Sequence, residues 1–180
     1  MRSLRRTLAA SVAAALPILG VAAFAPGTAS AQPAALSVQD QDFLIAAHQG
    51  NLAEMASGAR ATISPQVACA AVRQLGPVLV TDHGRLDASG LGVAMQNGVA
   101  LPLTPSAAQT QQLMSTGMKT GADFDRAWLQ MQQGFHTQTL AAINQELATG
   151  TSPAVKMVAQ TAAPVVQNHL AMVNAALATC

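Results

Sequence analysis

Apolar residues recur every three to four positions along four long segments of this chain, the spacing expected of helices that each bury one face. Capping and stop residues set the bounds of these segments. Ser37 and Asp40 resemble a capping box, Gly150 is a typical helix stop, and Ser152-Pro153 is a typical helix start. The expected helices run from Ser37 to about Thr62, from about Gln66 to Gln96, from about Asp123 to Thr149, and onward from Ser152.

Two breaks interrupt this pattern. Gly76-Pro77 predicts that the second helix is kinked or divided, because proline lacks the backbone donor that the helix requires. The stretch 99–121 contains Pro102 and Pro105, followed by the weakly amphipathic segment Ser106–Lys119. We interpret it as a crossover that contains a short connecting helix.

Composition favours helices packed on helices. The chain has 180 residues, is rich in Ala, Val, Leu, Met and Gln, and is only 3% aromatic. No fixed-period repeat is visible. After removal of the N-terminal segment discussed below, six Lys and Arg residues face eight Asp and Glu residues, a formal charge of −2. This charge argues against nucleic acid as a partner.

The N-terminus has the features of a secretory signal peptide. Three arginines precede the apolar stretch Leu8–Phe24, and Ala29-Ser30-Ala31 supplies the small residues of a cleavage site. A membrane anchor is the alternative, but Pro17, Gly20 and Pro26 interrupt a stretch shorter than the ~20 residues that a bilayer requires. We therefore expect a leader over residues 1–31, a linker over 32–36 and one domain over 37–180.

The mature protein is thus expected to be exported to the periplasm or envelope, with no transmembrane segment. A protein or envelope partner remains open.

Histidines and one glutamate lie near the middle of the predicted helices. Glu54, His83, His136 and His169 come one from each long helix, and the three histidines lie on apolar stripes that should face inward. Cofactor sites inside helical bundles are assembled in this way. His48 lies about 120° around the helix from Glu54, so it is not expected to join them.

Three imidazoles and one carboxylate would suit a single zinc, copper or iron ion. Asp87, one turn after His83, is a further ligand or a supporting partner in this interpretation, and Met172 would favour cuprous copper. A di-iron centre is disfavoured, because such centres use Glu three residues before His. The corresponding residues here are Val80, Gln133 and Val166.

A purely structural role is the alternative to metal binding. Glu54 and the histidines could form a buried hydrogen-bonded cluster that fixes helix pairing in a non-catalytic envelope protein or partner-binding module. No nucleophile motif surrounds Cys69, Ser57 or Ser89, and glycine-rich phosphate loops are absent. The sequence therefore predicts no particular reaction.

Several short motifs occur in order along the chain: Asp42-Phe43-Leu44, Glu54, Asp82-His83, Leu101-Pro102, Phe124-Asp125, His136, Pro164 and His169-Leu170. Taken together, they resemble an exported bacterial family catalogued as domain-of-unknown-function family 4142. Its members are often labelled membrane or outer-membrane proteins and are grouped with ferritin-like bundles. The resemblance implies a ferritin-like four-helix bundle and is compatible with a metal site, but implies no established activity. Phe135 and Asn168 depart from the family, which often has an acidic residue before these histidines.

Cys69 and Cys180 distinguish two helix orders. In a ferritin-like bundle the crossover makes the second and third long helices parallel, which brings the start of the second and the end of the fourth to one end. In a simple up-down-up-down bundle the two cysteines would lie some 40 Å apart. We predict the ferritin-like order, with the short extra helix in the crossover, and a Cys69–Cys180 disulfide, which export permits.

Overall fold

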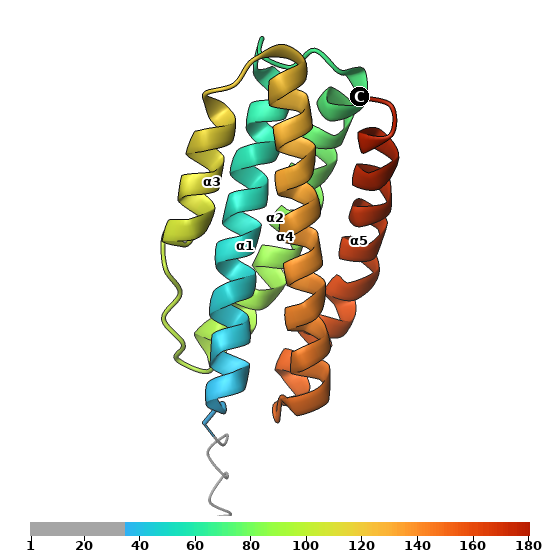
Figure 1. Cartoon of the computed structure of the whole chain (residues 1–180). Coiled ribbons are helices and arrows are strands. Elements are labelled where there is room, and N and C mark those ends of the chain that lie inside the picture. Colours follow the sequence, from blue (N-terminus) through green and yellow to red (C-terminus); the bar gives the residue numbers. More distant parts are fainter. Residues whose placement is uncertain (1–34) are drawn as a thin grey trace, which may run out of the picture. The chain divides into compact units, whose positions relative to one another are not determined.

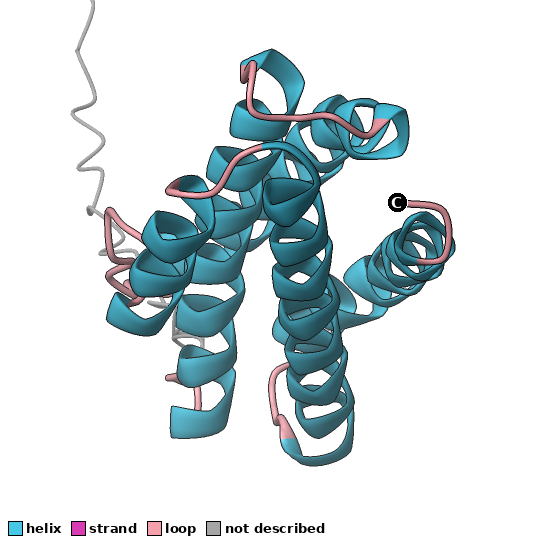
Figure 2. Cartoon of the chain, turned by 45° about the horizontal axis from the view of Figure 1, so that its top comes forward, coloured by secondary structure: helices cyan, strands magenta, loops and turns pink. Residues whose placement is uncertain are grey.

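A computed structural model describes residues 35–180, which fold into five helices and no strand (Figures 1 and 2). The expected leader and residues 32–34 of the expected linker lie outside the described residues. The prediction of an all-helical bundle is therefore confirmed for the part that the structure describes. The helices are α1 (Val38–Ile63), α2 (Ala70–Gln96), α3 (Ala107–Gly117), α4 (Gly121–Thr149) and α5 (Pro153–Leu177).

The four long helices pack around a common interior. α1 contacts α2 and α4, while α5 contacts the same two helices from the other side. Figure 1 shows α1 and α5 running in one direction and α2 and α4 in the other. The short helix α3 lies outside this group against α1 and α4, within the crossover from α2 to α4.

Three helices begin at a serine cap, as local sequence favours. Ser37 and Asp40 form a reciprocal capping box at the start of α1, which confirms the predicted box. Ser106 forms a second box with Gln109 at the start of α3. Ser152 caps α5, where proline occupies the first turn.

The prediction that the second long helix begins near Gln66 is wrong, because α2 begins at Ala70. The side-chain amide of Gln66 donates to the carbonyls of Gly117 and Lys119, and the backbone carbonyl of Gln66 accepts from the backbone amide of Gly121. These bonds hold Gln66 in the connection between helices, against the start of α4. α2 itself continues through Pro77 as one helix and is not divided.

Buried apolar side chains form two clusters along the bundle. The upper cluster contains Leu79, Trp128 and Val173, and the lower cluster contains Ile143 and Val166. Along α2, α4 and α5, the boundary between these clusters falls at the central histidines. Polar side chains thus separate two apolar layers.

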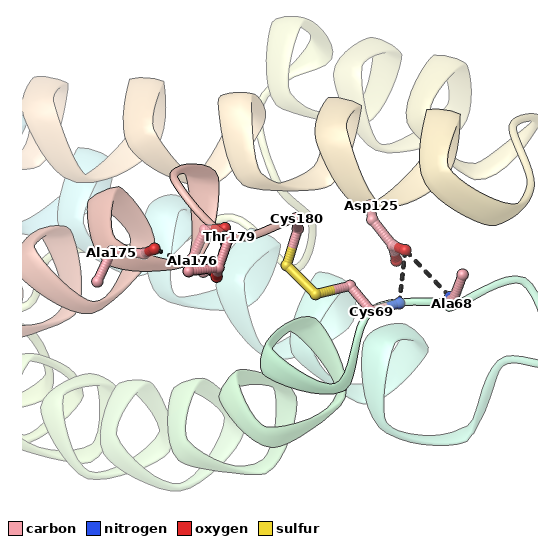
Figure 3. Close-up of a disulfide and its surroundings, with 7 residues drawn as sticks. All are labelled: Ala68, Cys69, Asp125, Ala175, Ala176, Thr179 and Cys180. Carbon is pink, nitrogen blue, oxygen red and sulfur yellow. Dashed lines mark hydrogen bonds between the residues drawn. A yellow bond between two sulfur atoms is a disulfide. The ribbon is translucent and has the colours of Figure 1, made fainter.

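A disulfide joins Cys69, at the start of α2, to Cys180, just after the end of α5 (Figure 3). The Cα atoms are 5.9 Å apart, so the two helix ends lie side by side, and the predicted bridge is confirmed. Beside it, the buried carboxylate of Asp125 accepts from the backbone amides of Ala68 and Cys69, at 3.1 and 2.7 Å. This side chain from α4 holds the backbone just before α2, a helix whose N-cap residue makes no side-chain capping bond.

Within residues 35–180, none of the helices combines the length and the apolar character that crossing a membrane would need.

Candidate metal centre

Three histidines from three helices meet in the interior, as a group that we call the trihistidine layer: His83 of α2, His136 of α4 and His169 of α5. Their ring centroids lie 5.3–5.5 Å apart, close to an equilateral triangle. No ring is more than 3% exposed. One nitrogen from each ring can be chosen so that all three lie within 4.8 Å of one another.

Two of these rings are fixed by oxygen acceptors at Nδ1. His83 Nδ1 lies 2.9 Å from Asn51 Oδ1, and His136 Nδ1 lies 2.8 Å from the carbonyl oxygen of Gln132. A carbonyl or amide oxygen can only accept, so Nδ1 carries the proton in both rings. Nε2 of each ring is therefore left with a free lone pair when the ring is neutral.

His169 is held in the opposite tautomer. Its Nε2 lies 3.1 Å from Oδ2 of Asp82, whose other carboxylate oxygen is 3.7 Å from the guanidinium of Arg85. The proton therefore lies on Nε2, and Nδ1 carries the free lone pair.

The three free nitrogens have no partner. His83 Nε2, His136 Nε2 and His169 Nδ1 are all buried and make no hydrogen bond. A buried polar atom left without a partner costs about 1–3 kcal/mol of folding free energy. Three such atoms in one layer therefore destabilise the interior at this point. In metal-binding histidines, one ring nitrogen donates its proton to a hydrogen-bond acceptor, and the other keeps a free lone pair for the metal.

Burial also keeps the rings neutral. It lowers the pKa of His83 to about 3, with a further contribution from repulsion by His136 and His169. Burial likewise lowers the pKa of His136 to about 4, although the bond to Gln132 opposes the shift. Both rings are thus in the form that a metal ion requires at neutral pH.

Glu54 lies behind His136 rather than beside the free nitrogens. Its Oε1 is 3.3 Å from His136 Nδ1, the nitrogen that already carries a proton. The amide of Gln132 donates to both carboxylate oxygens, at 2.5 and 2.9 Å, while its oxygen accepts from Ser57. Burial raises the pKa of Glu54 well above its usual value, against the effect of the Gln132 bond.

Residues 25–176 match the family described as "Domain of unknown function (DUF4142)". The chain belongs to this family. The match covers most of the chain and confirms the resemblance noted in the sequence, but the family's description assigns no activity. Comparison with curated proteins and with solved structures gives no match.

In this DUF4142 chain, the four residues singled out by sequence all meet at one level of the bundle, but not in one role. The three histidine rings lie together and each has one buried nitrogen without a partner, whereas Oε1 of Glu54 lies beside Nδ1 of His136. Helical spacing indicates which residues face inward, but it does not indicate which atom of a side chain faces a neighbour.

Asp87 and Met172, the other ligands suggested by the sequence of this DUF4142 chain, bond to residues outside the trihistidine layer. Asp87 lies 2.7 Å from Nδ1 of His48, and Nε2 of that ring contacts the carbonyl oxygen of Pro102 at 2.9 Å. His48 thus lies outside the trihistidine layer, as its spacing from Glu54 predicts. The sulfur of Met172 accepts from the amide of Asn168.

Sequence reasoning missed the partners that orient the rings. Asn51, Asp82 and Gln132 were not predicted to have a role at the centre, although Asp82 directly precedes His83. Asp82 is offset by about 100° from its neighbour around α2, so it points to a different helix and supports the ring of α5 instead. No local signal in the sequence indicates that Asp82 of α2 supports a histidine of α5.

Proposed function

We propose that this chain binds a single transition-metal ion through Nε2 of His83, Nε2 of His136 and Nδ1 of His169. Two observations carry the proposal: each of the three adjacent rings has one buried nitrogen without a partner, and the rings can offer one nitrogen each within 4.8 Å of one another. Asn51, Gln132 and Asp82 fix the ring orientations from behind.

A purely structural polar cluster is the weaker explanation of this geometry. Such a cluster stabilises a core when every member is satisfied. Here each ring is satisfied on one side only. Sharing a proton between two rings would satisfy the pair, but the lowered pKa values of His83 and His136 oppose it.

The donor set suits zinc, copper or ferrous iron. Imidazole binds all three, and three histidines with one open position is a known arrangement for zinc. Tetrahedral bonds of 2.0–2.1 Å would place the nitrogens about 3.4 Å apart, and the three rings can offer one nitrogen each within 4.8 Å of one another. A bound ion would supply Lewis acidity at the open position.

Glu54 has a supporting role in this proposal. An oxygen of the Glu54 carboxyl group lies 3.3 Å from the protonated Nδ1 of His136 and helps to hold the orientation of that ring. Gln132 in turn holds the carboxylate. We infer that Glu54 acts through His136 and is not itself a ligand.

The rest of the molecule is consistent with an exported ferritin-like protein. The parallel directions of α2 and α4, with a long crossover between them, are those that a ferritin-like bundle requires. A disulfide is typical of proteins that fold in an oxidising compartment. We therefore infer that the metal is bound outside the cytoplasm, in the periplasm or envelope.

Metal titration of chelator-stripped protein tests the proposal. Zinc, cuprous copper and ferrous iron would each be titrated against a chromogenic competitor, and the bound metal counted per chain. We expect one ion per chain in the wild type, with His83→Gln, His136→Gln and His169→Gln each weakening affinity by more than about a hundredfold. Glu54→Gln should weaken it by about 10–100-fold, as expected for a supporting partner.

The fourth histidine provides the control. His48→Gln removes a partly buried imidazole from the same bundle but leaves the trihistidine layer intact, so its affinity should equal that of the wild type. A wild type that binds none of the three metals would refute the proposal. Equal losses in the His48 and His83 variants would also refute it.

A further inference from the structure

A cavity of about 240 Å³ lies between α1, α3 and α4. α3 packs against the two long helices and supplies one wall through Leu113, Met114 and Thr116 (Figure 1). Neither Glu54 nor any histidine of the trihistidine layer is among the described residues that line it. The cavity is therefore a site apart from the proposed metal centre.

The inner end of this cavity is apolar. Phe124 and Trp128 of α4 are at most 1% exposed, and both belong to the upper apolar cluster together with Met131, which also lines the cavity. The polar groups at this end are already paired. The indole N–H of Trp128 donates to the backbone carbonyl of Ser57, and the Ser57 hydroxyl donates to the side-chain oxygen of Gln132. The inner end thus favours the apolar part of a ligand.

Arg60 supplies a positive charge at the outer end. Its side chain is exposed, and its Nη2 donates to the carbonyl of Gly117, at 2.6 Å, which follows Thr116 of the cavity wall. Nη2 also donates to the side-chain oxygen of Gln66. Both partners are uncharged, and none of the ion pairs within residues 35–180 includes Arg60. Among the described residues that line the cavity, it alone is charged.

The guanidinium of Arg60 keeps donors for an anion. It carries five N–H groups, and both of its bonds to the protein come from Nη2, so Nε and Nη1 have no partner in the described part of the chain. A carboxylate can accept two parallel N–H groups from one guanidinium. A cation at the outer end and an apolar inner end together match a ligand with an acidic head and an apolar body.

We propose that this cavity binds a small amphipathic monocarboxylate, with its apolar body against Phe124 and Trp128 and its carboxylate at Arg60. The volume lies just below the roughly 300–1,000 Å³ of typical small-molecule pockets, so the ligand is smaller than a drug-sized molecule. This inference requires no metal and goes beyond the proposed function.

Straight-chain acids of increasing length test the apolar part. Metal-free protein would be titrated calorimetrically with butanoate, hexanoate and octanoate. We expect each added methylene to tighten binding about fourfold, as burial of a CH₂ group predicts. The fluorescence of Trp128, the only tryptophan of the chain, should change over the same range of octanoate concentration, because this side chain lies at the inner end.

Octan-1-ol tests the charge, because it has the same chain length and a neutral head. The wild type should bind octanoate at least about tenfold more tightly than octanol, as hydrogen bonds to a charged group predict. Arg60→Gln should lose this preference through weaker octanoate binding, with octanol bound as in the wild type. Arg73→Gln is the matched control, since this exposed arginine also donates to a backbone carbonyl, that of Val67, but does not line the cavity.

A filled cavity gives an independent arm. Ala56 lines the cavity from an exposed position of α1, so Ala56→Leu should weaken the binding of octanoate and octanol alike, each at least about tenfold. Ala59 is exposed on the same helix but is not a lining residue. Ala59→Leu should therefore change neither affinity.

The outcomes do not depend on the metal proposal, because no metal is present in these titrations. Failure of the wild type to bind octanoate at millimolar concentration would refute the site. Equal affinities in Ala56→Leu and Ala59→Leu would also refute it. Octanol bound as tightly as octanoate, or equal losses in Arg60→Gln and Arg73→Gln, would overturn the carboxylate class.

Discussion

At the scale of single residues, the candidate centre depends on which ring nitrogen each histidine exposes. Oxygen acceptors fix the proton on Nδ1 of His83 and His136 and on Nε2 of His169. The opposite nitrogens are buried and have no partner. If these rings were flipped, these nitrogens would no longer be free to bind a metal ion.

The lowered pKa of His83 makes a prediction about stability without metal. In the unfolded chain the ring titrates near 6.5, but in the folded protein only near 3, so between these values the unfolded state binds the extra proton. The free energy of unfolding should therefore fall as pH drops below about 6.5. His83 contributes up to about 1.4 kcal/mol per pH unit to this fall.

Urea unfolding of stripped wild type and His83→Gln between about pH 4 and pH 6.5 measures this contribution. Glu54 acts in the opposite direction, because its raised pKa means that the folded state binds the extra proton. The comparison of the two proteins isolates the histidine. A difference in unfolding free energy that stays constant with pH would contradict the assignment.

Residue spacing predicted part of this centre. The three histidines could be identified because helical periodicity places them on inward faces near mid-helix. The role of Glu54 could not be identified, since contact with the back of His136 depends on how far apart α1 and α4 lie. The partners Asn51 and Asp82 depend on helix rotation in the same way.

At the scale of elements, α1 and α2 approach each other through a pair of glycines. A Cβ at Gly76 would lie 2.6 Å from the carbonyl oxygen of Gly58 and 2.6 Å from Thr62 Oγ1, closer than atoms can approach. A Cβ at Gly58 would in turn lie 2.7 Å from the carbonyl oxygen of Gly76. This close contact fixes the spacing of the helices that carry Glu54 and His83.

We expect Gly76→Ala to destabilise the protein by about 1–3 kcal/mol, because the helices must separate to admit the methyl group. Gly92→Ala is the matched control, since its Cβ would meet no atom within 4 Å. It should instead stabilise α2 by up to about 1 kcal/mol through helix propensity. Chemical denaturation measures both, and equal effects of the two substitutions would show that the helices do not touch at Gly76.

Sequence patterns predicted where the helices begin better than they predicted the contacts between helices. Ser37, Ser106 and Ser152 fixed three helix starts through local hydrogen bonds, which neighbouring residues alone determine. The start of α2 was misplaced because Gln66 bonds to residues more than fifty positions away. Such long-range bonds leave no periodic signal.

At the scale of the whole molecule, the Cys69–Cys180 disulfide connects residues 111 positions apart and closes α2 to α5 into one loop, with α1 outside it. The sequence predicted it only through the choice of helix order, because cysteine spacing alone cannot give connectivity.

Cross-linking of so long a loop should stabilise the fold by about 2–5 kcal/mol, mainly by restricting the unfolded chain. Replacement of both cysteines by alanine should lower the free energy of unfolding by this amount, and a reducing agent should then have no further effect. Metal affinity should change little, because the trihistidine layer lies about half a helix away from the bridge. Unchanged stability in the double variant would mean that the bridge does not form in the exported protein.

X-ray absorption spectroscopy of the zinc-loaded protein tests the metal centre most directly. The account predicts three imidazole nitrogens at about 2.0–2.1 Å from a single zinc ion, with one of them lost in His83→Gln and all retained in His48→Gln. A zinc environment of oxygen atoms alone, or a spectrum that the His83 substitution leaves unchanged, would contradict it.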